Sequence, residues 1–486
     1  MGAVLHEVVV PRICELASSV SNRRMVGFLF YRAWIYLAFF SPALIPHGTQ
    51  SDFFLLNDCS RLALTVSLLV FGLGFGKTLE KTSLGSLSAA GAAAIVLGTL
   101  LASLTNTTTT ALHAAFVAGS LLTGVGSAAL LLALGKAYKK TAAPRVAAEV
   151  SVAFILSSLA TPLACFLAAE AATFLAVVFP ILSWAALRRY GNEEEGETEI
   201  APDFDIRQSN RLLAKITIAV VSFSVALSLL RTTLNTAHSE MLSLQSSGIV
   251  ASSAAFGGLI VLGILVFSKK LSLAFSYKPV LWLAAAGCFL FTLLDFGSFL
   301  PYFFARTGYV CFTILTWVVL ADISRRGSLP WTKVFGIGQA GIAFGSQIGS
   351  KLSIYFTTTD NLPSETLVAT TGALTLLLVF VYTFVLTELD ISRIFPSKTA
   401  PGKEPDSAPS GPTRKELAQA VASFYKLGDR ATEVMVLYSQ GYTRKRIEQE
   451  LFMSEGTVNS HLRNIYASLD VHSKQELIDL IEGYRE

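Results

Sequence analysis

The sequence predicts an all-α protein in two parts: a polytopic membrane bundle of about 12 spanning helices, arranged 6+6, and a small soluble domain of four or five short helices. Only 15% of the 486 residues are charged, against roughly 25% in soluble domains. Long apolar runs recur from the N-terminus to about residue 389, whereas residues 412–486 have the composition of a soluble domain. This asymmetry indicates two domains in different solvents.

A membrane-spanning helix requires about 20 mostly apolar residues. By that criterion, the first half (about 27–187) is expected to hold spans near 27–45, 61–76, 84–104, 111–134, 146–167 and 169–187. The second half (about 212–388) is expected to hold spans near 212–230, 247–268, 279–299, 302–322, 332–355 and 367–388. Because the 61–76 run is short and residues 146–187 contain almost no loop, the predicted number of spans is 12 to within one or two.

The basic residues of the connections predict which side of the membrane each connection faces. Lysine and arginine concentrate before the first span and in the even-numbered connections: Arg12, Arg23, Arg24; Lys77, Lys81; Lys136, Lys139, Lys140, Arg145; Arg188, Arg189, Arg207, Arg211; Lys269, Lys270, Lys278; Arg325, Arg326, Lys333. Residues 105–110 and 167–169 carry none. Cytoplasmic connections are enriched in these residues, so both ends of the chain are expected in the cytoplasm.

The longest connection, residues 188–211, is acidic, lacks apolar periodicity and separates two sets of six spans. It is interpreted as a cytoplasmic linker. Two six-helix bundles joined in this way resemble the layout of the major facilitator superfamily. That superfamily usually has an Asp-Arg pair in the loop after its second span. The corresponding GFGKTLEKTSLG stretch here has neither residue, which argues against transport.

Six polar side chains inside the predicted spans are candidates for a ligand or signal site: Arg32, Glu149, Asp295, Arg306, Gln339 and Gln347. Ionisable side chains are costly in lipid and often functional. A structural interpretation carries more weight. It pairs Asp295 with Arg306 across a tight outer turn and lets Arg32 and Glu149 reach inward to the cytoplasmic surface. Both interpretations stay open.

The predicted eleventh span contains a glycine ridge, Gly341, Gly345 and Gly349, at four-residue spacing. Such a ridge lets another helix approach closely. Packing within the chain is favoured over a dimer interface.

Residues 391–412 contain five prolines and predict a linker. Beyond it, short helices are predicted over 413–426, 429–439, from Thr443 to Leu451, from Ser454 onward and over 473–484. Helix-terminating Gly441 and the capping box of Ser473 with Glu476 support these boundaries. Tight turns between short helices predict a helix-turn-helix, whose second helix enters the DNA major groove.

This tail resembles the LuxR-type helix-turn-helix family over about 60 residues. The residues that carry the resemblance are Glu433, Gly441, Ile447, Leu451, Ser454, Thr457, Val458, His461, Ile465, Tyr466, Leu469, Val471 and Ser473. A many-span bundle followed by such a domain resembles the membrane-bound LuxR-type regulators of bacteria. The resemblance implies a multi-pass protein of the bacterial cytoplasmic membrane, double-stranded DNA as a partner, and a homodimer on DNA.

By the resemblance, the recognition helix runs from Ser454 to about Leu469. It assigns base reading to Asn459, Ser460 and Arg463, because asparagine pairs with adenine and arginine with guanine. Phosphate contacts are expected from the following residues: Thr457, His461, Asn464, Arg444, Lys445 and Arg446. Val458, Ile465 and Leu469 are expected to face the domain core.

Three departures qualify the resemblance. Many family members carry lysine at the position of Asn459, which predicts a different preferred sequence. Asp470 occupies a position that is expected to need positive φ, which aspartate tolerates. Residues 412–486 hold 10 Lys+Arg and 11 Asp+Glu, a net charge of −1. DNA binders usually present a basic face, so binding must depend on local clusters and on dimers.

Three functions were weighed from these observations. The favoured one is a membrane-anchored one-component transcriptional regulator, whose bundle senses an unknown small-molecule or membrane signal. The alternatives are a transporter with a regulatory tail and a tail that binds protein rather than DNA. The five scattered cysteines and the absence of a P-loop, nucleophile elbow or metal-ligand spacing predict no enzymatic activity, cofactor or metal.

Overall fold

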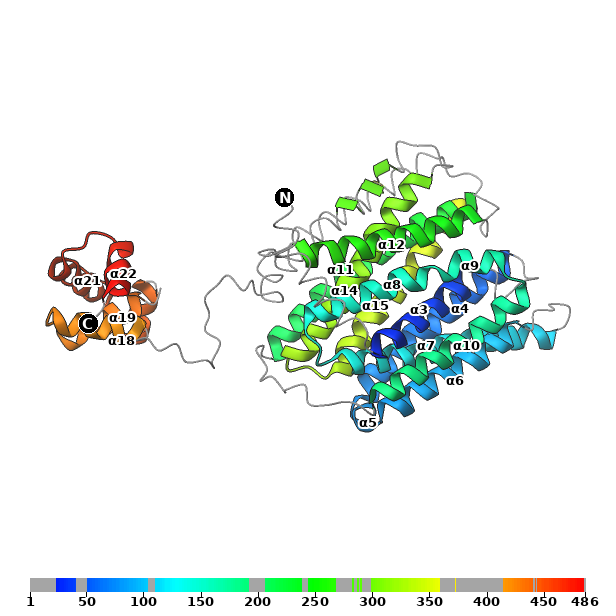
Figure 1. Cartoon of the computed structure of the whole chain (residues 1–486), viewed down its shortest axis with the longest axis horizontal. Helices are drawn as coiled ribbons and strands as arrows, with labels where there is room; N and C mark the ends of the chain where they lie inside the picture. Colours follow the sequence, from blue (N-terminus) through cyan, green and yellow to red (C-terminus); the bar gives the residue numbers. More distant parts are fainter. Residues whose placement is uncertain are drawn as a thin grey trace, which may run out of the picture. The chain divides into compact units, whose positions relative to one another are not determined.

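The computed structural model describes residues 23–40, 50–103, 110–191, 206–237, 244–267, 299–358, 414–439 and 444–484, with single positions at 282–283, 286–287, 289–290, 372 and 442. Every regular element in these ranges is a helix. The chain divides into two compact units, Met1–Ala400, called the membrane unit, and Pro401–Glu486, called the C-terminal unit (Figure 1). The predicted linker 391–412 and the side chain of Asp295 lie outside the described residues.

The first part of the membrane unit contains α3 (Arg23–Phe40), α4 (Gln50–Leu69) with the π-helical turn η3 (Val70–Gly74), α5 (Gly76–Lys81), α6 (Leu84–Ser103), α7 (Thr110–Tyr138), α8 (Ala143–Ser158), α9 (Ala160–Phe166) and α10 (Ala169–Gly191). The second part contains α11 (Ile206–Ala237), α12 (Leu244–Phe267), α14 (Phe299–Arg326) and α15 (Trp331–Thr358). Most run along a common direction as one bundle (Figure 1).

Among the described residues, eight helical stretches are long and apolar enough to cross a membrane: Ser51–Gly74, Leu84–Ser103, Leu112–Tyr138, Ala143–Phe166, Glu170–Gly191, Ile206–Leu229, Ser247–Val266 and Leu300–Arg326. The helices α3 and α15 coincide with two more expected spans; α3 carries three arginines, and α15 is rich in glycine and polar residues. The expected spans 279–299 and 367–388 fall almost entirely outside the described residues.

Two expected boundaries are wrong. The second span was expected at 61–76, but its helix begins at Gln50, and its polar residues Asp58 and Arg61 are hydrogen-bonded to side chains of α15. The linker 188–211 is helical at both ends, since α10 continues to Gly191 and α11 begins at Ile206. The span expected at 146–167 agrees with the helical stretch Ala143–Phe166, which is divided at Leu159 into α8 and α9. Pro162 follows closely and lacks the N–H that a continuous helix would use.

The glycine ridge of α15 packs against α11, as the sequence analysis favoured. A Cβ atom added at Gly345 would lie 2.5 Å from the backbone oxygen of Val221, and one at Gly349 would lie 2.2 Å from that of Val225. At this crossing, the hydroxyl of Ser228 donates to the backbone oxygen of Ser346 at 2.7 Å. The ridge therefore brings the two backbones together within one chain.

The second unit contains five helices, α18 (Arg414–Phe424), α19 (Asp429–Ser439), α20 (Arg444–Leu451), α21 (Glu455–Leu469) and α22 (Lys474–Gly483), close to the predicted boundaries. They enclose a core of buried side chains: Ala418, Val421, Ala422, Val434, Met435, Val436, Tyr438, Ile447, Val458, Leu462, Ile465, Leu469, Val471, Leu477 and Ile481. This core belongs to the unit alone, so the unit has what it needs to fold independently.

Candidate nucleic-acid interface and membrane cavity

The helix α21 begins at a well-formed N-cap. Ser454 has extended backbone angles, and its hydroxyl accepts a hydrogen bond from the backbone N–H of Thr457 at 3.2 Å. The Thr457 hydroxyl lies 2.8 Å from the same oxygen. Serine caps fix the first turn of a helix by satisfying a free N–H group. The start of the candidate recognition helix is thereby set by its own sequence.

One face of α21 packs on the domain core and the other carries polar side chains. Val458, Leu462, Ile465 and Leu469 are buried, which confirms the prediction that Val458, Ile465 and Leu469 face the domain core. The polar residues divide by exposure: Thr457, Ser460, Arg463 and Asn464 are exposed, and Asn459 and His461 are half-buried. The candidate base-reading residues Asn459, Ser460 and Arg463 therefore lie on the polar side of α21, where they are wholly or partly accessible.

The preceding helix, α20, is anchored by fully buried Ile447 and presents basic side chains. Arg444 and Arg446 are exposed. The guanidinium of Arg446 lies 5.1 Å from the ring centre of Tyr442, and its Nε lies 3.8 Å from a carboxylate oxygen of Glu450. An exposed pair of this kind contributes at most about 1 kcal/mol, so Arg446 remains available to a phosphate. The side chain of Lys445 is not described.

The end of α21 adopts the expected geometry. Asp470 has φ 53° and ψ 44°, in the left-handed region, and its N–H donates to the backbone oxygen of Tyr466. The hydroxyl of Tyr466 donates to that of Tyr438 at 3.4 Å, which connects α21 to α19. The need for positive φ at position 470 is therefore confirmed, and aspartate meets it at low cost.

The capping box at α22 makes the stability of this unit depend on pH. The Glu476 carboxylate accepts from the His472 N–H at 2.8 Å and from the Ser473 hydroxyl at 2.9 Å. These bonds lower the pKa of Glu476 below its ordinary value of 4.5. A carboxylate whose pKa is lower in the folded state contributes stability above its unfolded-state pKa, and the contribution is lost as pH falls through the folded value.

We expect the free energy of unfolding of residues 412–486, measured by urea titration, to fall as the pH is lowered from about 5 to 3. The Glu476→Gln variant should show a shallower fall over this window, because it has no carboxylate to protonate. The exposed substitution Ser468→Ala serves as a control, since it removes no titrating group and leaves the Gln475–Asp479 hydrogen bond intact. An unchanged pH profile in Glu476→Gln would contradict this assignment.

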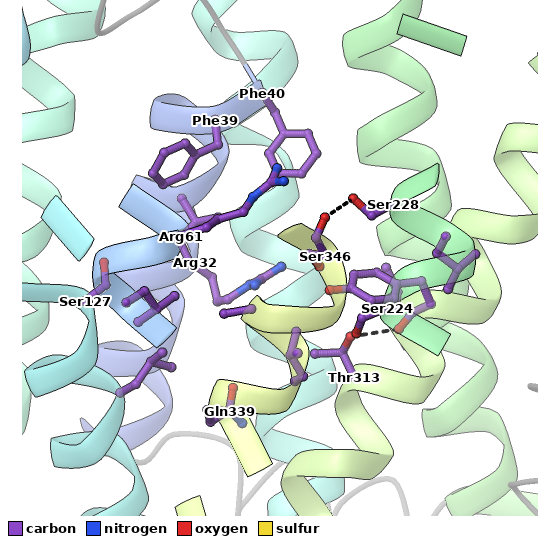
Figure 2. A pocket seen from close by; sticks show the side chains of 18 of the residues that line it. Arg32, Phe39, Phe40, Arg61, Ser127, Ser224, Ser228, Thr313, Gln339 and Ser346 are labelled. Carbon is purple, nitrogen blue, oxygen red and sulfur yellow. Dashed lines mark hydrogen bonds between the residues drawn. The ribbon is translucent and has the colours of Figure 1, made fainter. Parts of the chain in front are cut away.

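The membrane unit contains a cavity of about 200 Å³ between its two halves. Its walls come from α3, α4, α7 and α8 of the first half and from α11, α14 and α15 of the second half. Among the candidate ligand residues, Arg32, Arg306 and Gln339 line this cavity, whereas Glu149 and Gln347 do not. Figure 2 shows Gln339 on α15 and Arg32 on α3 in the cavity wall.

Glu149 does not reach the surface, so that part of the structural interpretation is wrong. Its carboxylate is fully buried and accepts two hydrogen bonds from Arg24, at 2.8 Å from Nε and 2.9 Å from Nη2. Arg24 also donates to Thr141 and to the Tyr190 hydroxyl. Arg145 reaches the carboxylate from α8 itself, at 3.3 Å. The Arg24–Glu149 pair therefore joins α3 to α8, Arg24 also connects α3 to α10 through Tyr190, and Arg24 belongs to a helix rather than a loop.

Gln347 likewise has a partner outside the cavity. Its amide donates to Asp58 at 3.1 Å, and Lys351 forms a salt bridge with the same carboxylate. Sequence reasoning missed Arg61, which lies in the cavity wall, because the apolar window placed the second span's start at 61 and treated preceding residues as a loop. The sequence signal that indicates a helix here is the three-residue separation of Asp58 and Arg61, which places both side chains on one helix face.

A multi-pass helical membrane unit and a separate helix-turn-helix unit define the class of protein. Residues 426–481 match a family model described as "Bacterial regulatory proteins, luxR family". The C-terminal unit is thus a LuxR-type helix-turn-helix domain. A curated relative, the "uncharacterized response regulatory protein YgeK" of Escherichia coli K12, is 38% identical over 64 residues, or 13% of this chain and 44% of that protein. The chain therefore spans less than half the length of this relative.

Solved structures resemble the membrane unit. The human organic anion transporter MFSD10 (TETRAN) has TM-score 0.55 at 14% identity, covering 75% of this chain and 99% of that one. A bacterial homologue of the iron transporter ferroportin has 0.56 at 13% identity, covering 75% and 98%. The major facilitator superfamily proton:xylose symporter XylE has 0.51 at 13% identity, covering 78% and 99%. At such identities the likeness establishes a major-facilitator-like fold and no substrate.

Proposed function

We propose that the protein is a membrane-anchored one-component transcriptional regulator and not an enzyme. The observation that carries the proposal is the LuxR-type domain at residues 426–481, with a recognition helix whose exposed face holds Ser460, Arg463 and Asn464. Asn459 and Arg463 read bases from this helix, and Arg444 and Arg446 position it on phosphates. The domain binds promoter DNA as a homodimer, because one copy with few basic residues binds weakly.

The bundle senses a signal and transmits it to the DNA-binding domain. A ligand shifts a conformational equilibrium only by its difference in affinity for the two states. A signal that favours one arrangement of the two bundle halves therefore alters dimerisation or accessibility of the tail. The cavity between the halves is the place in the described part of the bundle where such a ligand would contact both.

We propose the bacterial cytoplasmic membrane as the location, with both chain ends in the cytoplasm. Contacts between connections support this orientation. Lys136, at the end of α7, donates to the backbone oxygens of Leu79, Glu80 and Thr82 after the second span. Lys333 donates to Asn210 at 2.8 Å. The basic connections thus meet one another at a shared end of each half, as a common cytoplasmic side requires.

Selection of bound DNA from a random pool, with residues 412–486 as bait, tests the DNA-reading part. We expect a defined motif, and we expect Asn459→Ala together with Arg463→Ala to abolish its enrichment. Each bidentate base contact contributes about 1–3 kcal/mol of discrimination. Ser468→Ala, an exposed position near the far end of α21, should leave the motif unchanged. No enrichment, even by an artificially dimerised bait, would contradict DNA reading by this helix.

A further inference from the structure

Three arginines from different helices line the cavity of the membrane unit: Arg32 of α3, Arg61 of α4 and Arg306 of α14. No aspartate or glutamate is among the described residues of the lining. Figure 2 shows Arg32 and Arg61 extending in the same direction, from the first-half helices toward α15. Guanidinium groups remain charged in proteins, so the cavity wall carries a concentrated positive charge.

Neutral groups hold these arginines in place. Arg61 donates to Asn57 Oδ1 at 3.1 Å and to Ser350 Oγ at 2.8 Å. The Arg32 guanidinium lies 4.2 Å from the ring centre of Phe154, and that of Arg306 lies 4.5 Å from the ring centre of Phe40. Aromatic rings orient a guanidinium without neutralising its charge.

The nearby carboxylate of Asp58 interacts electrostatically with Arg61, but a single carboxylate does not balance three arginines. It lies outside the cavity lining, and it is already engaged by Lys351 and Gln347. Glu149 is similarly occupied by Arg24 and Arg145. Both of these carboxylates are thus engaged by cations outside the cavity lining.

The buried polar atoms left without a partner point to the same chemistry. Arg306 is 7% exposed and Gln339 is 6% exposed. The Nε atoms of Arg32 and Arg306 and the Nε2 atom of Gln339 are buried and lack a hydrogen-bond partner among the described residues. All three atoms are donors, and a buried donor without an acceptor costs about 1–3 kcal/mol. Among the described residues the cavity therefore lacks an acceptor for these donors, and an anion would supply acceptors and charge together.

We propose that this cavity binds a small organic anion, with its carboxylate or phosphate among Arg32, Arg61 and Arg306 and an apolar body against Phe28, Phe154 and Trp317. The role of this anion as the sensed signal rests on the proposed function. At about 200 Å³ the cavity is smaller than the roughly 300–1,000 Å³ typical of drug-sized ligands, which limits the body to about one ring. Since the arginines come from both halves, the anion favours the arrangement that brings them together.

The test uses the purified full-length protein in detergent and three nitroaromatic probes that quench tryptophan fluorescence. The probes are 4-nitrobenzoate, 4-nitrophenyl phosphate and the neutral isostere 4-nitrobenzamide. We expect saturable quenching by the two anions and at least about tenfold weaker binding of the amide. Trp317→Phe should reduce the quenching amplitude, because Trp317 lines the cavity.

Single replacements Arg32→Gln, Arg61→Gln and Arg306→Gln should each weaken anion binding at least about tenfold, with little change for the amide. Arg189→Gln, an exposed arginine on α10 outside the lining, is the matched control and should bind normally. Where a glutamine variant does not fold, the discrimination between anion and amide by the unmodified protein still decides. Equal affinity for anion and amide, or glutamine variants that fold and bind normally, would overturn the proposal.

Two further measurements complete the test. One distinguishes a free anion from a lipid headgroup, and the other distinguishes failure of the anion site from failure of the regulator proposal. Competition by glycerol phosphate identifies a free anion, whereas competition by phosphatidylglycerol alone identifies a lipid headgroup with the same chemistry. Selection of DNA by the same protein preparation is measured alongside. DNA selection without anion binding overturns the anion site and leaves the regulator proposal standing. Anion binding by a protein that selects no DNA supports the site and contradicts the regulator proposal.

Discussion

Glu149→Ala is expected to prevent the protein from accumulating as a folded species in the membrane. The substitution leaves Arg24, 1% exposed, without the carboxylate that accepts two of its hydrogen bonds. Removing one partner of a buried pair costs about 3–5 kcal/mol, because the remaining charge is uncompensated. That is a large fraction of the roughly 5–15 kcal/mol by which most domains are stable. The folded fraction is measured by size-exclusion chromatography of the detergent extract, with a fluorescent protein fused to the chain as the detection label.

Two comparisons make this expectation specific to the buried pair. Glu433→Ala removes the partner of Arg430 from an exposed pair of the C-terminal unit, 48% and 64% exposed, and should change stability by less than about 1 kcal/mol. Replacing both members, as Arg24→Met with Glu149→Met, should restore much of the folded fraction, since no lone charge remains. A normal elution profile for Glu149→Ala would show that Arg24 is not held as described.

Gly349→Ala is expected to destabilise the second half of the bundle, although it adds a single methyl group. The added Cβ would lie 2.2 Å from the backbone oxygen of Val225 and 2.9 Å from the backbone nitrogen of Leu229. Because backbone cannot move aside as a side chain does, α11 and α15 must separate. Overpacking of this kind costs about 1–3 kcal/mol or more. The melting temperature of the purified protein measures the loss.

The same ridge provides the control. At Gly341 an added Cβ would meet side-chain methyl groups of Thr217 and Val221 at 3.3 Å and 3.4 Å, which can adjust slightly. Gly341→Ala should therefore lower the melting temperature much less than Gly349→Ala. Equal melting temperatures for the two variants would contradict the close approach of α11 and α15 at Gly349.

The helices of the C-terminal unit were predictable because local sequence signals determine their ends. Ser454 and Ser473 form side-chain caps, and Asp470 takes the left-handed conformation that closes α21. Each signal acts within four residues, so no knowledge of the tertiary structure is needed. The buried face of α21 follows from the helical spacing of its apolar residues.

The polar interior of the bundle was less predictable because its pairings join residues far apart in sequence. Arg24 and Glu149 are 125 residues apart, and Arg61 and Ser350 are 289 apart. A hydropathy window treats each such residue as evidence against a span, which moved the expected start of α4 from Gln50 to residue 61. Apolar length located the spans, but it could not distinguish Arg32 and Arg306, which line the cavity, from Glu149, which is bonded to Arg24.

The central claim is that a membrane-held protein reads DNA through α21. Its most direct test is recovery of DNA cross-linked to the full-length protein in the membrane fraction of cells that express it, followed by sequencing. We predict discrete enriched sites that contain the motif selected by residues 412–486, and loss of these sites in the Asn459→Ala, Arg463→Ala double variant. Sites that persist unchanged in that variant, or a membrane fraction with no enriched DNA, would contradict the claim.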